Sequence, residues 1–304
     1  MKINLLHKKL SKSLLLALAI SVLSFSSVYA TDFIVPDWGD VSFSNRTEAS
    51  GTIQLGVGAI LGFNNSTLGN DAGGRFTVTM NDSRIDLNSS STLYVDNFSS
   101  TGSNTIVLWS SIFAADNSVL GVNELRLYGN SIFKATTFTG YSIELDDSAR
   151  IEFAANVNSI ATYSSTSSWI SKGSSTVNTL YASDGINIEF LMTSATDTLN
   201  IGNFYTANTN DIQIGFTDEF IESIAAGAGY FDFDAYDTVV ISSITGGGHV
   251  GHSVRDYSDS YTWTLTDFGD GTYRISDIVI PEPSTYAVIF GVLALGLAIY
   301  RRRK

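Results

Sequence analysis

The chain has 304 residues, 44% of them hydrophobic and 15% charged, and it contains no cysteine. Its 30 Asp and Glu residues outnumber 17 Lys and Arg residues, which gives a formal net charge of −13. The lack of cysteine excludes disulfides, thiol catalysis and cysteine metal sites. The acidic balance argues against nucleic acid as a partner, because phosphates are repelled by such a surface.

The segment from Met1 to Ala30 has the parts of a secretory signal peptide. Four lysines precede an apolar core over residues 14–23, and a small-residue cleavage pattern ends at Ala30. We therefore expect export through the Sec translocon and cleavage by signal peptidase after Ala30.

The expected exported part, residues 31–280, is more acidic than the whole chain. Eight of the 17 basic residues lie in the two terminal segments, so nine remain, against 29 of the 30 acidic residues. The resulting charge of about −20 makes calcium and cationic polymers the electrostatically favoured partners. The simpler interpretation is that these carboxylates keep an extracellular protein from aggregating.

Short alternating runs of apolar residues indicate strands. They cover residues 75–80, 124–128, 142–145 and 211–216, and Asn, Ser, Asp and Gly separate them. Helical periodicity is confined to residues 219–228. The exported part is therefore expected to be nearly all β.

The spacing of these runs indicates a repeat. The repeated unit is an apolar-x-apolar pair, five residues, and a second apolar-x-apolar pair. One copy of this unit begins at Leu125 and the next begins at Ile143. Less regular copies begin at Ala161 and Leu180, and a separate copy begins at Ile85. A repeat of about 18 to 19 residues with two short strands predicts the rungs of a β-solenoid, similar to a β-helix. A β-sandwich is the alternative.

The solenoid is expected to cover residues 31–245, followed by a hinge at Gly246-Gly247-Gly248. Residues 246–280 contain two alternating runs within 261–275 that flank Asp270-Gly271, the pattern of a β-hairpin. We expect this hairpin to cap the last rung, since an open solenoid end is prone to self-association.

Motifs for catalysis are scarce. The chain has no Gly-x-Ser-x-Gly, phosphate-binding glycine loop or His-Glu-x-x-His. Asp146-Asp147 and Asp218-Glu219 are carboxylate pairs of the kind that glycosidases use, but acidic residues are frequent enough here for such neighbours to arise by chance. We assign no catalytic residue and expect a protein that is not an enzyme.

Two clusters contain metal-ligating residue types. Asp232, Asp234 and Asp237 offer the hard oxygen ligands that calcium prefers, although their spacing matches no complete calcium loop. His249 and His252 would need a third ligand and a rigid frame. The expectation is therefore no cofactor, with calcium at the three aspartates as the alternative.

The tryptophans leave a further alternative open. Trp38, Trp109, Trp169 and Trp263 can stack on sugars where they are exposed, and otherwise they fill the core. A carbohydrate-binding or carbohydrate-active surface protein, similar to a glycoside hydrolase, is accordingly the second functional hypothesis.

The C-terminal segment, residues 281–304, has three parts. The first is the motif of Pro281, Glu282 and Pro283, which its prolines keep extended. The second is the uncharged segment from Tyr286 to Tyr300, which is typical of a transmembrane helix. The third is the basic end, expected in the cytoplasm, which consists of Arg301, Arg302, Arg303 and Lys304.

This order over residues 281–304 resembles the PEP-CTERM sorting signal of Gram-negative bacteria. The resemblance implies an exosortase, a membrane-embedded protease that cuts near the Pro-Glu-Pro motif, and bacteria that produce exopolysaccharide and form biofilms. We therefore expect an exported structural protein of the cell surface or extracellular matrix. It would be anchored transiently in the membrane, with the exosortase and exopolysaccharide as its partners.

Overall fold

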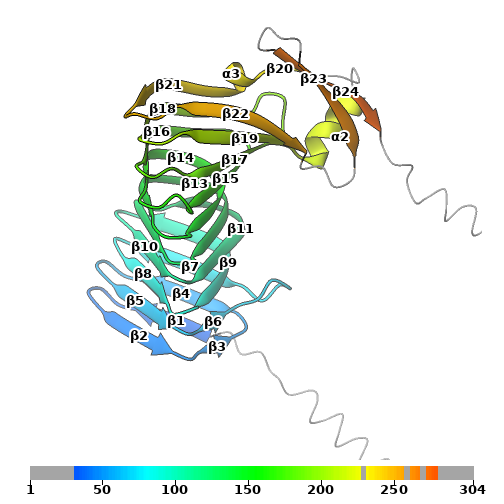
Figure 1. The fold of residues 1–304 in the computed structure, drawn as a ribbon. Coiled ribbons are helices and arrows are strands. Elements are labelled where there is room, and N and C mark those ends of the chain that lie inside the picture. The colour runs from blue at the N-terminus through cyan, green and yellow to red at the C-terminus, as the bar shows by residue number, and fades with distance from the viewer. Residues whose placement is uncertain (1–30, 227–230, 257–260, 268–271, 280–304) are drawn as a thin grey trace, which may run out of the picture.

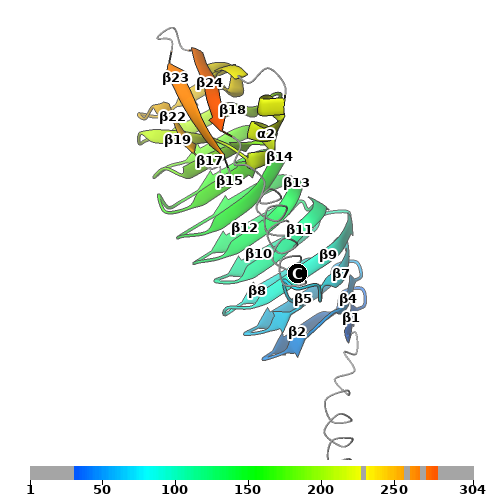
Figure 2. The same cartoon turned by 90° about the vertical axis from the view of Figure 1, so that its right-hand side faces the viewer.

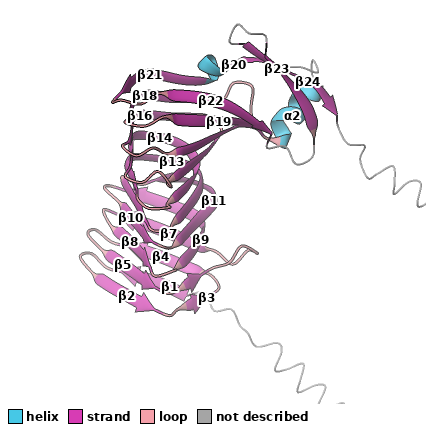
Figure 3. Ribbon diagram, viewed as in Figure 1, coloured by secondary structure: helices cyan, strands magenta, loops and turns pink. Residues whose placement is uncertain are grey.

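The computed structural model describes residues 31–226, 231–256, 261–267 and 272–279. Most of them are in strands, which stack into a parallel β-solenoid of about 9 turns (Figure 1 and Figure 3). Strands of successive turns pair in parallel from the first coil to the last. The predicted solenoid is confirmed, and the alternative of a sandwich is wrong because sandwiches are built from antiparallel strands.

Each coil has three sides, which we call faces 1, 2 and 3 in chain order. Face 1 contains β1 (Thr31–Val35), β4 (Gly51–Leu55) and β7 (Phe76–Asn81). Face 2 contains β2 (Asp40–Ser44), β5 (Ile60–Asn64), β8 (Arg84–Asn88), β10 (Thr105–Trp109) and β12 (Glu124–Tyr128). Face 3 contains β3 (Thr47–Glu48), β6 (Thr67–Leu68), β15 (Ser168–Lys172), β17 (Asn187–Met192), β19 (Asn210–Phe216) and β22 (Val250–Asp256).

Longer strands continue around the corners between faces. Those from face 3 to face 1 are β9 (Thr92–Thr101) and β11 (Ile112–Gly121). Those that touch all three faces are β13 (Ile132–Leu145) and β14 (Arg150–Thr162). Those from face 1 to face 2 are β16 (Ser175–Ala182), β18 (Leu199–Thr206) and β21 (Val239–Thr245).

The interior consists of columns of apolar side chains that run along the solenoid axis. Alternate residues of each strand point inward, and parallel pairing in register places each one above its counterpart in the next coil. The rings of Phe113 and Phe133, for example, stack with centroids 4.8 Å apart. One column on face 3 is at most 1% exposed: Leu68, Leu93, Phe113, Phe133, Ile151, Trp169, Ile188 and Ile212.

A ladder of buried serines fills the corner between faces 2 and 3. The backbone N–H of Ser91 donates to the hydroxyl of Ser111 in the next coil at 3.2 Å, and Ser111 repeats this contact with Ser131. The Ser111 hydroxyl in turn donates to the carbonyl of Trp109 at 2.8 Å. The ladder supplies partners to N–H groups that turn inward where the chain changes direction.

The repeat is less uniform than predicted. The predicted length holds in the middle, where Ile132 pairs with Arg150. Near the N-terminus, however, Gly51 pairs with Phe76, which is a longer step because the loop between β6 and β7 lies in this coil. Near the C-terminus, the step from Ile212 to its counterpart His252 is longer still, because a segment of another fold is inserted there.

Two details of the repeat prediction need correction. The copy that begins at Ala161 is displaced by one residue, since Ile143 pairs with Ile160 and the expected inward Tyr163 is 49% exposed. The copy at Ile85 is also not separate, because Ile106 continues its column toward Leu125.

A lateral unit lies beside the last coils (Figure 1 and Figure 2). It contains α2 (Asp218–Ala226), β20 (Phe231–Asp234), β23 (Thr262–Asp267) and β24 (Thr272–Val279), and the short helix α3 (Ala235–Thr238) leads from β20 into β21. The predicted helix and hairpin are both present. Strand β20 pairs with β24 as a third antiparallel strand that the sequence reading missed.

The hairpin does not extend the solenoid ladder as a cap would. In the described part of the chain, β21 pairs with β18, β22 pairs with β19, and the hairpin belongs to a separate sheet. The lateral unit contacts the solenoid at its side, where Trp263 packs edge-to-face on Phe216 at 5.5 Å. The glycine run expected as a hinge forms the corner between β21 and β22, so the solenoid continues past residue 245 to Asp256.

Candidate functional site

A hollow of about 300 Å³ at the corner between faces 1 and 2 and a larger one of about 610 Å³ on face 3 mark the solenoid surface. The larger hollow spans strands β13, β14, β15 and β17. Phe153, Ile170 and Leu191 supply its apolar lining, and Thr136 and Thr193 supply hydroxyl groups. A surface of this mixed character can accept the apolar and polar sides of a small ligand.

An irregular corner accompanies this hollow. The parallel register of β13 and β14 shifts between Lys134 and Thr137, where the chain turns from face 3 to face 1. Such irregularities bend a strand and redirect its side chains. Ala135 and Thr136 lie within the shifted segment and line the hollow.

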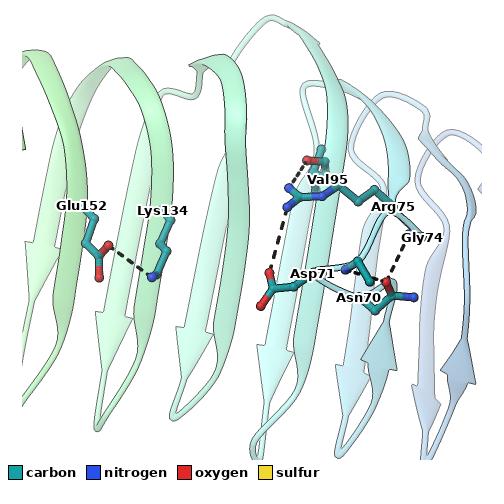
Figure 4. A network of polar contacts seen from close by, with 8 residues as sticks. Asn70, Asp71, Gly74, Arg75, Val95, Lys134 and Glu152 are labelled. Atoms are coloured by element: carbon teal, nitrogen blue, oxygen red, sulfur yellow. Dashed lines mark hydrogen bonds and ion pairs between the residues drawn. The ribbon is translucent and has the colours of Figure 1, made fainter. Parts of the chain in front are cut away.

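Three of the nine cations within residues 31–280 line this hollow: Lys134, Arg150 and Lys172. Glu152 is the one carboxylate in its lining. The Lys134 Nζ lies 3.2 Å from Glu152 Oε2, a contact that Figure 4 shows, and the Arg150 Nε lies 2.8 Å from Glu152 Oε1. The lining therefore carries a net positive charge on a strongly acidic protein.

The third cation, Lys172, also influences the start of α2. The pKa of Glu219 is lowered chiefly by a hydrogen bond from its own backbone N–H, next by one from Thr217, and further by the charge of Lys172. The charge of Lys172 therefore also acts on a carboxylate of α2. The hollow on face 3 suits an anionic group on a partly apolar ligand. Hydrolysis of a glycoside would need a second carboxylate at about 5 to 10 Å from that of Glu152.

A second polar network holds the loop between β6 and β7 (Figure 4). Arg75 donates to the carbonyl of Val95 at 3.4 Å, lies 4.0 Å from the Asp71 carboxylate and has its guanidinium over the ring of Tyr94. The N–H of Asn70 donates to the Gly74 carbonyl at 2.6 Å and closes the loop. These contacts account for a loop anchored to the neighbouring coil.

The tryptophans divide between core and surface. Trp169 is fully buried and donates its indole N–H to the carbonyl of Phe153 at 3.1 Å, and Trp263 of the lateral unit packs against Phe216 of the solenoid. Trp38 is 79% exposed and Trp109 is 51% exposed. Two tryptophans are therefore accessible to a ligand.

Face 2 has two aromatic stacks. Trp109 stacks on Tyr128 at 4.1 Å between ring centroids, and Tyr181 stacks on Tyr205 at 4.5 Å. The rings occupy equivalent outward positions in successive coils, so the repeat itself brings them together. Such stacks stabilise the ladder, and their exposed portions offer aromatic surface to a sugar.

Charged side chains surround the first stack. Arg126 Nη2 donates to Glu124 Oε1 at 2.7 Å, and this hydrogen bond is the largest cause of the raised pKa of Arg126. The pKa of Tyr128 is raised first by burial and then by the Glu144 carboxylate. The tyrosine therefore keeps its proton above the pH at which a free tyrosine loses it.

The three aspartates proposed for calcium are only partly brought together. Asp232 forms a two-pronged ion pair with Arg274, at 2.6 and 3.2 Å, and it lines a small hollow with Asp237. The side chain of Asp234 lies outside the described set. Within the residues that the structure describes, no group of three acidic, histidine or cysteine side chains is placed to hold a metal ion.

The predicted sorting residues lie outside the described residues. These are the cleavage site at Ala30, the motif of Pro281, Glu282 and Pro283, the helix from Tyr286 to Tyr300 and the basic end. Among the described helices, none has both the length and the apolar character needed to span a membrane.

Comparison of the chain with protein-family models, curated proteins and solved structures finds no match.

The sequence reading missed the cationic hollow, although a signal for it existed. Lys134 and Glu152 stand one predicted repeat apart, and so they occupy neighbouring positions of one outward column. Applying the repeat to charged residues would have predicted that Lys134 and Glu152 lie side by side. The repeat would not have predicted Lys172, which lines the hollow at the corner where the chain leaves face 3.

Proposed function

We propose that the protein is an exported structural component of the cell surface or extracellular matrix, delivered by its PEP-CTERM-like signal. The observation that supports this most directly is the fold itself. Within the described residues the chain is a parallel β-solenoid of about 9 turns, held together by a continuous apolar core without disulfides. A fold built by stacking similar coils gives an extended surface, which suits a structural role.

The solenoid surface supports a structural role. Outward positions of neighbouring coils carry hydroxyl and amide groups that bond to each other, such as Thr79 with Ser99 at 3.1 Å and Asn81 with Thr101 at 3.0 Å. The continuous core gives an elongated shape without disulfides. Such a polar rod is suited to contact hydrated polymers along its length.

The test is the intact mass of the protein from envelope and medium fractions of the native host. Processing by an exosortase predicts a wild-type mass that ends near Pro281 to Pro283, and a Glu282→Ala variant that keeps its tail. Glu222→Ala removes an exposed carboxylate of α2 instead, and it should be processed like the wild type. A full-length tail in all three proteins would indicate a permanent anchor and overturn the sorting proposal.

Glycan binding at the hollow on face 3 is a second candidate function. Its support is the cluster of Lys134, Arg150 and Lys172 above an apolar lining, which suits a saccharide that carries a carboxylate. Titration calorimetry with oligogalacturonate, and with a neutral oligoglucan for comparison, tests it. Lys172→Ala should weaken binding of the acidic sugar by about 10-fold, since a hydrogen bond to a charged group contributes about 1.5 to 3 kcal/mol.

The matched control is Arg84→Ala, which removes a cation of face 2 that pairs with Asp86 at 2.5 Å. It should leave the affinity unchanged. Equal affinity of the wild type and Lys172→Ala, or no binding by either, would eliminate the hollow as an acidic-glycan site while leaving the sorting proposal intact.

A further inference from the structure

One inward column on face 3 has ionisable residues at both of its ends. Its eight inner members, from Leu68 to Ile212, are all apolar and buried. The same register continues to Glu48 in the first coil and to His252 in the last. An acidic group thus ends the core at the N-terminal coil, and an imidazole ends it at the C-terminal coil.

Both end coils also leave inward apolar side chains incompletely covered. Val41 and Phe43 of the first coil are partly exposed, whereas their counterparts one coil further in are fully buried. In the last coil, Ile244 is 46% exposed, whereas its partner Phe204 is fully buried. Among the residues that the structure describes, neither end coil has the second neighbouring coil that each inner coil has.

The backbone edges at the two ends are complementary. Among the described residues, β1, β2 and β3 pair on one side only, as do β21 and β22 at the other end. All of these strands are parallel, so the last coil of one molecule presents the edge that the first coil of another requires. The lateral unit lies beside the last coil, and does not pair with its edge (Figure 1).

We propose that copies of this protein associate head to tail, with the last coil of one copy stacked on the first coil of the next. Ile244 then continues the column of Val41 in the next copy, and His252 faces its Glu48. The charges of the end coils favour this order: residues 31–50 contain four acidic residues and one arginine, and residues 239–256 contain one aspartate, one arginine and two of the three histidines of the chain.

A second copy is the occupant that fits both ends. It supplies the same three-sided outline and the same strand direction, which an unrelated partner would have to imitate. Because the two contacting surfaces differ, the association does not close on itself and produces a filament.

The geometry sets the repeat of that filament. The column has ten positions per copy, from Glu48 through its eight inner members to His252, and at about 4.8 Å per position this gives about 48 Å per copy. Electron microscopy of the full-length protein, purified from the host in mild detergent, should show filaments with this axial repeat at high concentration.

Disulfide trapping tests the order of the contact, because the natural chain has no cysteine. Full-length Glu48→Cys and His252→Cys proteins should form a cross-linked dimer when mixed under oxidising conditions, whereas each alone stays monomeric on a non-reducing gel. The double variant should form a ladder of multimers, since its two cysteines lie in the first and last coils of the solenoid and cannot join within one molecule.

Asn187→Cys, exposed on face 3 of an inner coil, is the matched control and should not cross-link to His252→Cys. A second pair, Val41→Cys with Ile244→Cys, tests the same contact without altering Glu48. The Glu48 carboxylate accepts a hydrogen bond from the Thr31 hydroxyl at 2.7 Å. Cross-linking of either N-terminal variant with itself, or none in both mixtures, would overturn the proposal. Sorting and glycan binding do not depend on this outcome.

Discussion

The middle of the solenoid and the lateral unit are held by different kinds of contact. In the middle, each coil is covered on both sides, and Phe133 touches the rings of Phe113, Phe138 and Phe153. The lateral unit has three antiparallel strands, and its aromatic contact with the solenoid is concentrated at Phe216. The stability of the solenoid is therefore expected to depend on many contacts spread along its length, and that of the lateral unit on a few contacts.

The largest effect is expected from Phe133→Ala. The side chain is fully buried, and its loss should lower the free energy of unfolding by about 3 to 5 kcal/mol, measured by urea denaturation. Phe43→Ala, at the partly exposed first coil, should cost clearly less. Equal losses for the two variants would contradict the difference between inner and end coils.

Trp263→Ala is expected to have the next largest effect, and a local one. It removes the edge-to-face contact with Phe216 and should destabilise the lateral unit by about 2 kcal/mol. Hydrogen exchange should then accelerate in β20, β23 and β24 and stay unchanged in β13 and β14. Faster exchange in all of these strands would mean that the two regions unfold as one cooperative unit.

Ser111→Ala tests the corner ladder within the solenoid. It leaves the buried N–H of Ser91 without the hydroxyl that accepts its bond, at a cost of about 1 to 2 kcal/mol in chemical denaturation. Ser99→Ala, which removes a hydroxyl on the outer surface of face 1, is the matched control and should change stability by less than about 0.5 kcal/mol. If the two substitutions have the same effect, the ladder does not contribute as argued.

The smallest effect is a dependence on pH at the open C-terminal coil. Burial lowers the pKa of His252, and the Asp211 carboxylate opposes this shift only in part. The unfolded chain therefore binds the proton more readily, so this residue's contribution to stability is present above about pH 6.5 and declines as the pH falls below it.

A His252→Asn variant should lose less stability than the wild type between pH 7.5 and pH 5, measured by thermal unfolding in dilute solution. Both proteins keep the remaining titrating groups, so the difference between their curves isolates this histidine. Parallel curves would exclude a contribution from its protonation.

Much of the solenoid could be read from the order of residues, because alternation and repeat are local properties. Leu125 and Ile143 stand one predicted repeat apart and pair as expected. The repeat pattern did not identify the coil of Ile106. In this coil four residues, and not five, separate the two apolar pairs, because the corner between β10 and β11 is one residue shorter. A fixed spacing fails wherever corners differ in length.

By itself, the sequence determined the strand character of residues 31–280 and the existence of a repeat, since each depends on neighbouring residues. The signals expected at both termini stay a prediction. Only the tertiary structure decided which distant residues share a column or a surface. It placed Lys172 with Lys134 at one hollow, set the hairpin beside the last coil, and put Glu48 and His252 at opposite ends of one column. The physical reason is that such positions depend on the summed lengths of all intervening corners and insertions.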